Sequence, residues 1–111
     1  MKIEDMNRDE QSLLIYFETV AVDYGGLVES RRMNATDFEI ADQWDKTGFV
    51  RFGRLYSKDI KTTPGTGTRF DHWSVLSDEA WVEAHRARRA RAKRAERNLQ
   101  VDRNGYEEVA E

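Results

Sequence analysis

The stretch that decides the fold runs from Asn34 to Trp73 and reads NATDFEIADQWDKTGFVRFGRLYSKDIKTTPGTGTRFDHW. It has, in order, the patterns of a helix, a tight turn, a strand, a polar loop and a returning strand. Thr36 followed by Glu39 matches a capping box, which predicts that the helix begins near Asp37. Gly48 is expected to end this helix, because glycine adopts a left-handed backbone at little cost.

The predicted helix has two distinct sides. Its apolar residues recur at helical spacing and are expected to face the core: Phe38, Ala41 and Trp44, with Ile40 beside them. Its polar residues fall on the opposite side: Glu39, Asp42, Gln43 and Lys46. This outward side has three possible roles, namely a solvated surface, an acidic surface that binds protein, or a helix that reads DNA.

A hairpin is predicted to follow the helix. Phe49–Tyr56 and Asp71–Leu76 are rich in aromatic and β-branched residues and suit two strands, and Lys61–Arg69 between them is a loop by composition. The segment Pro64–Thr68 does not match a loop that holds a nucleotide, because the Lys-Ser/Thr pair of such loops is missing.

Two more helices are expected on either side of this stretch. Asn7 and Glu10 form a cap signal for a core helix that Gly25 and Gly26 end. The apolar residues of that helix are Leu13, Leu14, Phe17, Val20, Ala21 and Tyr24. Leu27-Val28 suits a short third strand, and Glu29–Met33 has room for about one helical turn. Ser77 is expected to cap a last helix whose core-facing residues are Ala80, Trp81, Ala84 and Ala87.

Composition fits one compact domain over residues 1–98 and a mobile tail over residues 99–111. The chain has 111 residues, of which 39% are hydrophobic and 35% charged, and it has no cysteine. A disulfide framework and a thiolate metal site are therefore excluded. No apolar run approaches the length of about 20 residues that spans a bilayer. We expect a cytoplasmic protein without a membrane partner.

The charge is unevenly distributed along the chain. Residues 1–84 contain ten lysines and arginines against 16 aspartates and glutamates, whereas residues 85–111 contain eight against five. The last helix, residues 77–98, is expected to project from the body and to carry most of these cations. Seven cations between Arg86 and Arg97 repel one another unless an anion lies nearby. That anion could be nucleic acid or an acidic protein surface, including that of a second copy, and plain solvation is the third possibility.

Catalysis has little support in the sequence. His72 and His85 are the only histidines, and no spaced set of metal ligands accompanies them. His72 next to Trp73 is expected to pack at the end of a strand. We therefore expect no enzymatic activity, no catalytic residues, no metal and no cofactor.

The order of these elements resembles that of the MarR- and ArsR-like winged helix-turn-helix regulators over residues 8–95. The most similar piece is Trp44–Val50, at the position where those regulators end the recognition helix and enter the wing. The resemblance implies an α+β, mainly helical fold and a homodimer formed through the N- and C-terminal helices. It also implies that the helix Asp37–Thr47 lies in the major groove with the wing beside it.

The resemblance further implies a DNA-binding transcription regulator, which we expect to be of phage or mobile-element type given the small size of the chain. Phosphate contacts would come from the wing and the last helix: Lys58, Lys61, Arg69, Arg88, Arg91 and Arg94. Base contacts would come from Gln43 and Lys46. The alternative is a phage-type inhibitor that binds a host protein through an acidic surface. The residues of that surface would be Glu39, Asp42 and Asp45.

Overall fold

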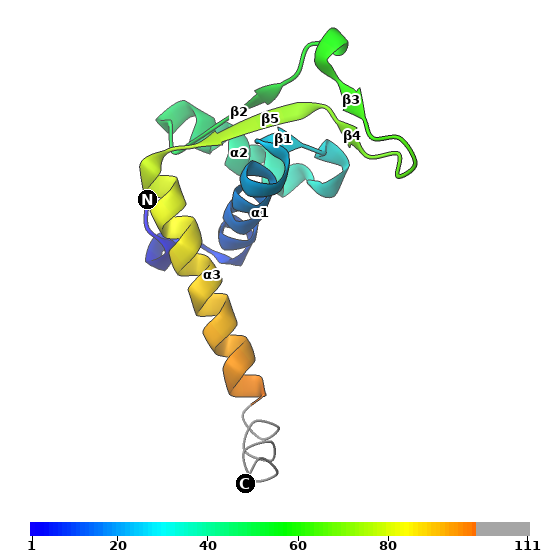
Figure 1. Ribbon diagram of the computed structural model, residues 1–111. Coiled ribbons are helices and arrows are strands. Elements are labelled where there is room, and N and C mark those ends of the chain that lie inside the picture. The colour runs from blue at the N-terminus through cyan, green and yellow to red at the C-terminus, as the bar shows by residue number, and fades with distance from the viewer. Residues whose placement is uncertain (100–111) are drawn as a thin grey trace, which may run out of the picture.

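The computed structural model describes residues 1–99, which form an α+β fold that is mainly helical (Figure 1). The helices are α1 (Arg8–Tyr24), α2 (Ala35–Thr47) and α3 (Asp78–Asn98), with short 3₁₀ turns at Ile3–Asp5, Ser30–Arg32 and Ser57–Asp59. The strands are β1 (Leu27–Val28), β2 (Val50–Arg54), β3 (Lys61–Thr62), β4 (Arg69–Phe70) and β5 (His72–Leu76). The predicted fold class is confirmed at this level.

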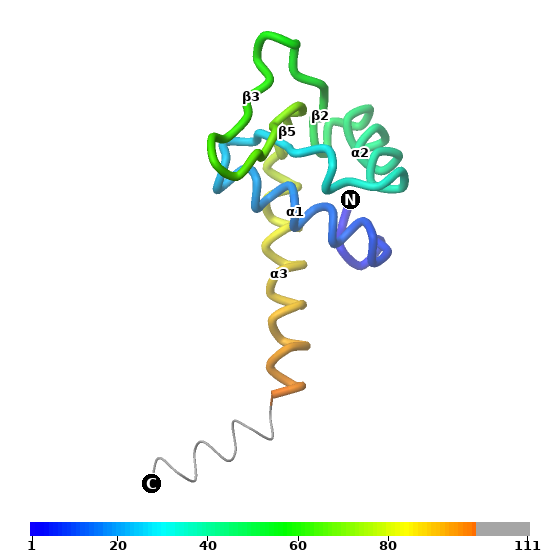
Figure 2. The backbone as a smooth tube through the Cα atoms, turned by 90° about the vertical axis from the view of Figure 1, so that its right-hand side faces the viewer, coloured from blue at the N-terminus to red at the C-terminus, as the bar shows by residue number. Residues whose placement is uncertain are grey.

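Three strands form an antiparallel sheet in the order β1-β5-β2. Val50 pairs with Leu76 and Phe52 pairs with Ser74, so the side chains that alternate inward come from both long strands. This inner side of the sheet packs on α1 and α2, which lie together beneath it (Figure 1). The β3–β4 hairpin extends beyond the sheet at the far end of β2 and β5 (Figures 1 and 2).

The core forms where α1 and α2 meet the sheet. Leu14, Phe17, Val28 and Val50 are its largest fully buried side chains. The ring of Phe17 lies 5.7 Å from that of Phe52 and thereby connects α1 to β2. The predicted core side of α1 is confirmed except at its last residue. Tyr24 is 52% exposed because its ring lies outside the core cluster, where it packs 5.1 Å from the ring of Phe70 of β4.

The helix starts confirm two predictions and correct one. Asn7 and Glu10 form the predicted capping box of α1, and Ser77 caps α3 by accepting from the Ala80 N–H at 3.1 Å. The predicted Thr36–Glu39 box of α2 is wrong. Asn34 accepts from the Asp37 N–H at 2.8 Å, and its own N–H donates to the Asp37 carboxylate at 3.1 Å. The helix therefore begins at Ala35, two residues before the predicted start.

The strands are shorter than predicted, and the loop contains more structure. Phe49–Tyr56 narrows to β2, and Asp71–Leu76 narrows to β5. Lys61–Arg69 was expected to be a loop, but its ends pair as β3 and β4. Leu27-Val28 is the predicted third strand, and the predicted helical turn after it is the 3₁₀ turn Ser30–Arg32.

Helix α3 has a packed half and a projecting half. Ala80, Ala84 and Ala87 are buried against the body, with Trp81 packed beside them, as expected. Residues 91–99 are all exposed, and the end of this part extends beyond the other elements (Figures 1 and 2). The predicted projection of the basic helix is confirmed. The predicted mobile tail falls almost entirely on residues 100–111, which lie outside the described residues.

Candidate nucleic-acid interface

Exposed cations gather around the β3–β4 hairpin and the end of the sheet that carries it. We call this set the wing surface: Arg31, Arg32, Arg54, Lys58, Lys61 and Arg69. Lys58, Lys61 and Arg69 were predicted from the sequence as phosphate contacts. Arg31, Arg32 and Arg54 were not, although an arginine pair just before a predicted DNA-reading helix was a usable signal.

Asp71 brings the two halves of the wing surface together. Its carboxylate accepts from the Ser30 N–H at 3.0 Å and from the Ser30 hydroxyl at 2.5 Å. These bonds tie the turn that carries Arg31 and Arg32 to the base of the hairpin. The side chain of Arg69 lies 3.8 Å from the same carboxylate and is 59% exposed. The wing surface is therefore a product of the tertiary fold.

The same carboxylate is held in its ionised form. Although burial of Asp71 opposes ionisation, hydrogen bonds from Ser30 and His72 lower its pKa from 3.8 to about 2. The His72 Nδ1 lies 3.0 Å from Asp71, and the imidazole stacks on Phe52 with 5.2 Å between ring centroids. His72 thus packs at the beginning of β5, as predicted for it.

The outward side of α2 is acidic and exposed. Glu39, Asp42, Gln43 and Lys46 all lie on the exposed face of the helix. Two of the four are carboxylates, which repel phosphates, whereas Gln43 and Lys46 carry the donors that base edges accept. Gln43 and Lys46, predicted to contact bases, and Glu39 and Asp42, predicted to bind protein, therefore lie on the same helix face.

Asp45 differs from the other acidic residues of α2. It accepts from the Arg51 Nε at 2.9 Å and from the Phe52 N–H at 3.0 Å. The hydrogen bond from the Phe52 N–H lowers the pKa of Asp45 most, and the hydrogen bond from the Arg51 guanidinium lowers it further. The carboxylate joins the last turn of α2 to β2, so the acidic surface available to a partner is centred on Glu39 and Asp42.

The packed half of α3 uses its cations to hold the body together. The Arg88 Nε donates to Glu18 of α1 at 2.5 Å, and its terminal nitrogen donates to the Thr19 hydroxyl at 2.9 Å. Arg86 pairs with Glu83 at 2.6 Å and with Glu4. The Arg86 hydrogen bond lowers the pKa of Glu4, and the Glu4 hydrogen bond raises the pKa of Arg86. The acidic body thus supplies the anions for the beginning of the basic run.

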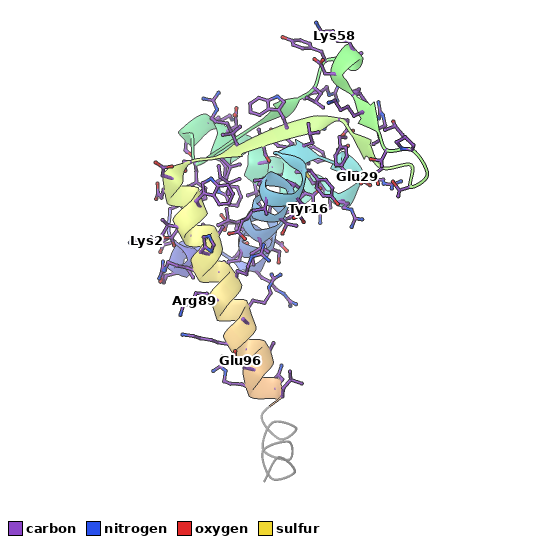
Figure 3. The ribbon with its side chains drawn as sticks, viewed as in Figure 1. Lys2, Tyr16, Glu29, Lys58, Arg89 and Glu96 are labelled. Atoms are coloured by element: carbon purple, nitrogen blue, oxygen red, sulfur yellow. The ribbon has the colours of Figure 1, made fainter. Side chains whose placement is uncertain are left out.

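The predicted phosphate contacts divide into two groups. Lys58 lies on the turn before β3, at the top of the view, and Arg89 lies on the basic helix α3 on the other side of the molecule (Figure 3). Arg88, Arg91 and Arg94 lie along α3, which extends away from the β3–β4 hairpin in both views (Figures 1 and 2). The predicted phosphate contacts of the wing surface and those of α3 therefore lie on separate parts of the molecule.

The remaining chemistry of the described residues is limited. Within residues 1–99, no group of three or more His, Cys, Asp or Glu side chains is arranged to hold a metal ion. None of the described helices has the length and apolar character needed to cross a membrane. Comparison of the chain with protein-family models, curated proteins and solved structures finds no significant match.

Proposed function

We propose that this chain is a non-enzymatic winged-helix module that binds duplex DNA in the manner of a transcription regulator. The element order supports this assignment. Helix α1 leads into the edge strand β1, and α2 ends at Gly48, whose φ of 80° is left-handed. The strands β2 and β5 then flank an extended hairpin, and the sheet order β1-β5-β2 places the last strand in the middle. In place of a full helix before α2 the chain has the 3₁₀ turn Ser30–Arg32.

The observation that carries the proposal is the wing surface. Its six cations stand out on a body that is otherwise acidic, since residues 1–84 contain 16 acidic against ten basic residues. The acidic groups beside it are Glu29, which is buried and paired with Arg31, and Asp59 and Asp71. Lysine and arginine side chains that neutralise phosphates supply the sequence-independent part of DNA affinity. We assign this role to the wing surface, and we place Gln43 and Lys46 of α2 at base edges.

The test is the salt dependence of duplex binding. Six phosphate contacts predict that the logarithm of the affinity falls with the logarithm of salt concentration with a slope of about −5. The triple reversal Lys58→Glu/Lys61→Glu/Arg69→Glu should weaken binding to every sequence and reduce the slope by about 3.

A matched control distinguishes the loss of the wing cations from a general change in the net charge of the protein. The reversal Arg89→Glu/Lys93→Glu/Arg97→Glu changes the charge equally on exposed positions of α3. It should leave the slope for a single duplex close to that of the wild type. The proposal is refuted if the wild-type protein does not bind duplex at low salt, or if the two triple variants lose equal affinity.

A second candidate function has its own observation, the exposed carboxylates of Glu39 and Asp42 on α2. On a DNA-facing helix these two groups repel phosphates, so Glu39→Lys/Asp42→Lys should raise duplex affinity at low salt. If the same face instead binds a basic host protein, the double variant should leave duplex affinity unchanged and abolish binding of that protein. Asp45→Lys would not test this surface, because Asp45 joins α2 to β2.

Pairing of two copies through the N- and C-terminal helices stays a prediction. The projecting half of α3 would bring Arg91, Lys93, Arg94 and Arg97 of both copies together, and like charges at close range repel. A dimer is therefore better accommodated by the packed half of α3 and by α1 than by the projecting arm. Sedimentation equilibrium at low and high salt tests this arrangement.

A further inference from the structure

A groove lies between the N-terminal part of α1 and the projecting half of α3, away from the wing. Its volume is about 810 Å³, and its lining comes from these two helices only. The lining residues are Arg8, Gln11, Ser12, Arg91, Arg94, Ala95 and Asn98. Three of them are arginines and none is a carboxylate, so every charge that lines the groove is positive.

The groove has a defined construction. One terminal nitrogen of Arg91 donates to the Ser12 hydroxyl at 3.1 Å, which holds the guanidinium between the helices. An arginine has five N–H donors, so most of those on Arg91 are left for a ligand. Arg8 and Arg94 form no ion pair within residues 1–99. Guanidinium, hydroxyl and amide groups together match the acceptor oxygens of phosphates.

The shape indicates a polymer backbone as the ligand. Arg91, Arg94 and Asn98 are spaced i, i+3 and i+7 on α3, so they share one face and extend over about 10 Å. One strand of DNA carries about three phosphates over that length. The groove has no aromatic lining residue on which a base could stack, so contacts to the backbone are favoured over contacts to bases.

We infer that this groove binds the sugar-phosphate backbone of a second nucleic-acid segment. Because it faces away from the wing, one chain then holds two duplex segments at once. The groove itself does not depend on the proposed function, but the bridging of two duplexes rests on the wing also binding DNA.

The direct experiment measures bridging. One duplex carries a donor fluorophore and a second carries an acceptor, and the wild-type protein should bring them together and produce energy transfer. Arg91→Glu/Arg94→Glu should reduce bridging at least tenfold while binding of a single duplex through the wing remains. The matched control is Arg89→Glu/Lys93→Glu, which makes the same charge change on the same helix but on positions that do not line the groove. It should bridge almost as well as the wild type.

A second measurement isolates the groove. In the Lys58→Glu/Lys61→Glu/Arg69→Glu background, the remaining duplex affinity should fall at least tenfold when Arg91→Glu/Arg94→Glu is added. The inference is overturned if the groove and control variants behave alike, or if the wing reversal alone removes all binding; in the second case the proposed function stands. Bridging by a dimer with two wings would survive Arg91→Glu/Arg94→Glu and would also overturn it.

The outcome for an acidic protein ligand differs. If the groove variant weakens binding of a polyglutamate probe but not of duplex, the groove takes an acidic peptide and the inference fails. If instead the groove variant loses duplex affinity and the wing variant does not, the inference holds and the proposed function fails.

Discussion

Replacing Arg88 with methionine should destabilise the fold more than replacing its ion-pair partner. The side chain of Glu18 is 5% exposed, whereas that of Arg88 is 48% exposed. The second carboxylate oxygen of Glu18 has no hydrogen-bond partner among the described residues, and the His85 Nε2 lies 3.8 Å from it. Removing Arg88 therefore leaves a buried carboxylate without its partner. Removing Glu18 leaves a guanidinium that water can reach.

The magnitude follows from this asymmetry. Breaking a buried ion pair by removing one partner costs about 3–5 kcal/mol, and the half-exposed arginine places this pair at the lower end. We expect Arg88→Met to reduce the free energy of unfolding by about 3 kcal/mol, and Glu18→Leu to reduce it by about 1 kcal/mol. The double variant Glu18→Leu/Arg88→Met should lie within about 1 kcal/mol of the wild type, because no unpaired charge is then buried.

The assay is urea unfolding followed by tryptophan fluorescence and far-UV circular dichroism, with the four proteins forming a double-mutant cycle. Arg89→Met is the control, because Arg89 is exposed on the adjacent position of the same helix. It should change stability by less than about 0.5 kcal/mol. The reasoning is refuted if Arg88→Met and Arg89→Met are equally stable, or if the double variant is no more stable than Arg88→Met alone.

Three further predictions concern stability. Asp71→Asn should reduce the free energy of unfolding by at most about 2 kcal/mol at neutral pH. Because the pKa of Asp71 in the wild type is about 2, the difference in stability between the two proteins should shrink in acid unfolding between pH 4 and 2. Gly26→Ala should reduce the free energy of unfolding, measured by thermal unfolding, by more than about 2 kcal/mol, because the added Cβ would lie 2.5 Å from the Ser74 backbone oxygen of β5. A Cβ added at Gly25 meets open space, so Gly25→Ala should reduce it by only about 1 kcal/mol. Asp45→Asn should lower the urea midpoint, whereas the exposed Asp42→Asn should not.

The direction of the Asp71 effect follows from which form the fold prefers. The folded state holds this carboxylate ionised, so its contribution is complete above the ordinary pKa of 3.8 and is lost as the pH falls through about 2. An equal difference between Asp71→Asn and the wild type at pH 7 and pH 2 would contradict the assignment of these hydrogen bonds.

Local patterns predicted the elements because each one is set by neighbours in the sequence. The apolar spacing of α1 and the glycines after α1 and α2 act within a few residues, and the structure follows them. The start of α2 was missed because two cap signals overlap, one at Asn34 and one at Thr36. Asp37, at the third helical position, completes the box at Asn34. Met33, which directly precedes Asn34, is buried in the core, so the chain leaves the core at Asn34.

The candidate site was less predictable, because it depends on contacts between distant residues. Arg88 reads as one of seven similar cations, and only the packing of α3 on α1 selects it to pair with Glu18, 70 residues away. Arg31 and Arg32 join the wing because Ser30 bonds to Asp71, 41 residues away. Neither pairing leaves a local pattern. The sequence shows that cations are abundant. Only the fold shows which of them pair with carboxylates of the body and which are available to a ligand.

A bound phosphate responds mainly to the charges closest to it, so the net charge of −3 does not decide whether DNA binds. At physiological ionic strength exposed charges are screened beyond about 8 Å. A phosphate at the wing surface therefore interacts mainly with Lys58, Lys61 and their neighbours. A base edge at α2 would interact mainly with Glu39 and Asp42. Lower salt lengthens this range and strengthens both the attraction of the wing and the repulsion of α2. Under the proposed function, the wing surface supplies the affinity for duplex, and Glu39 and Asp42 of α2 limit how closely the duplex approaches that helix.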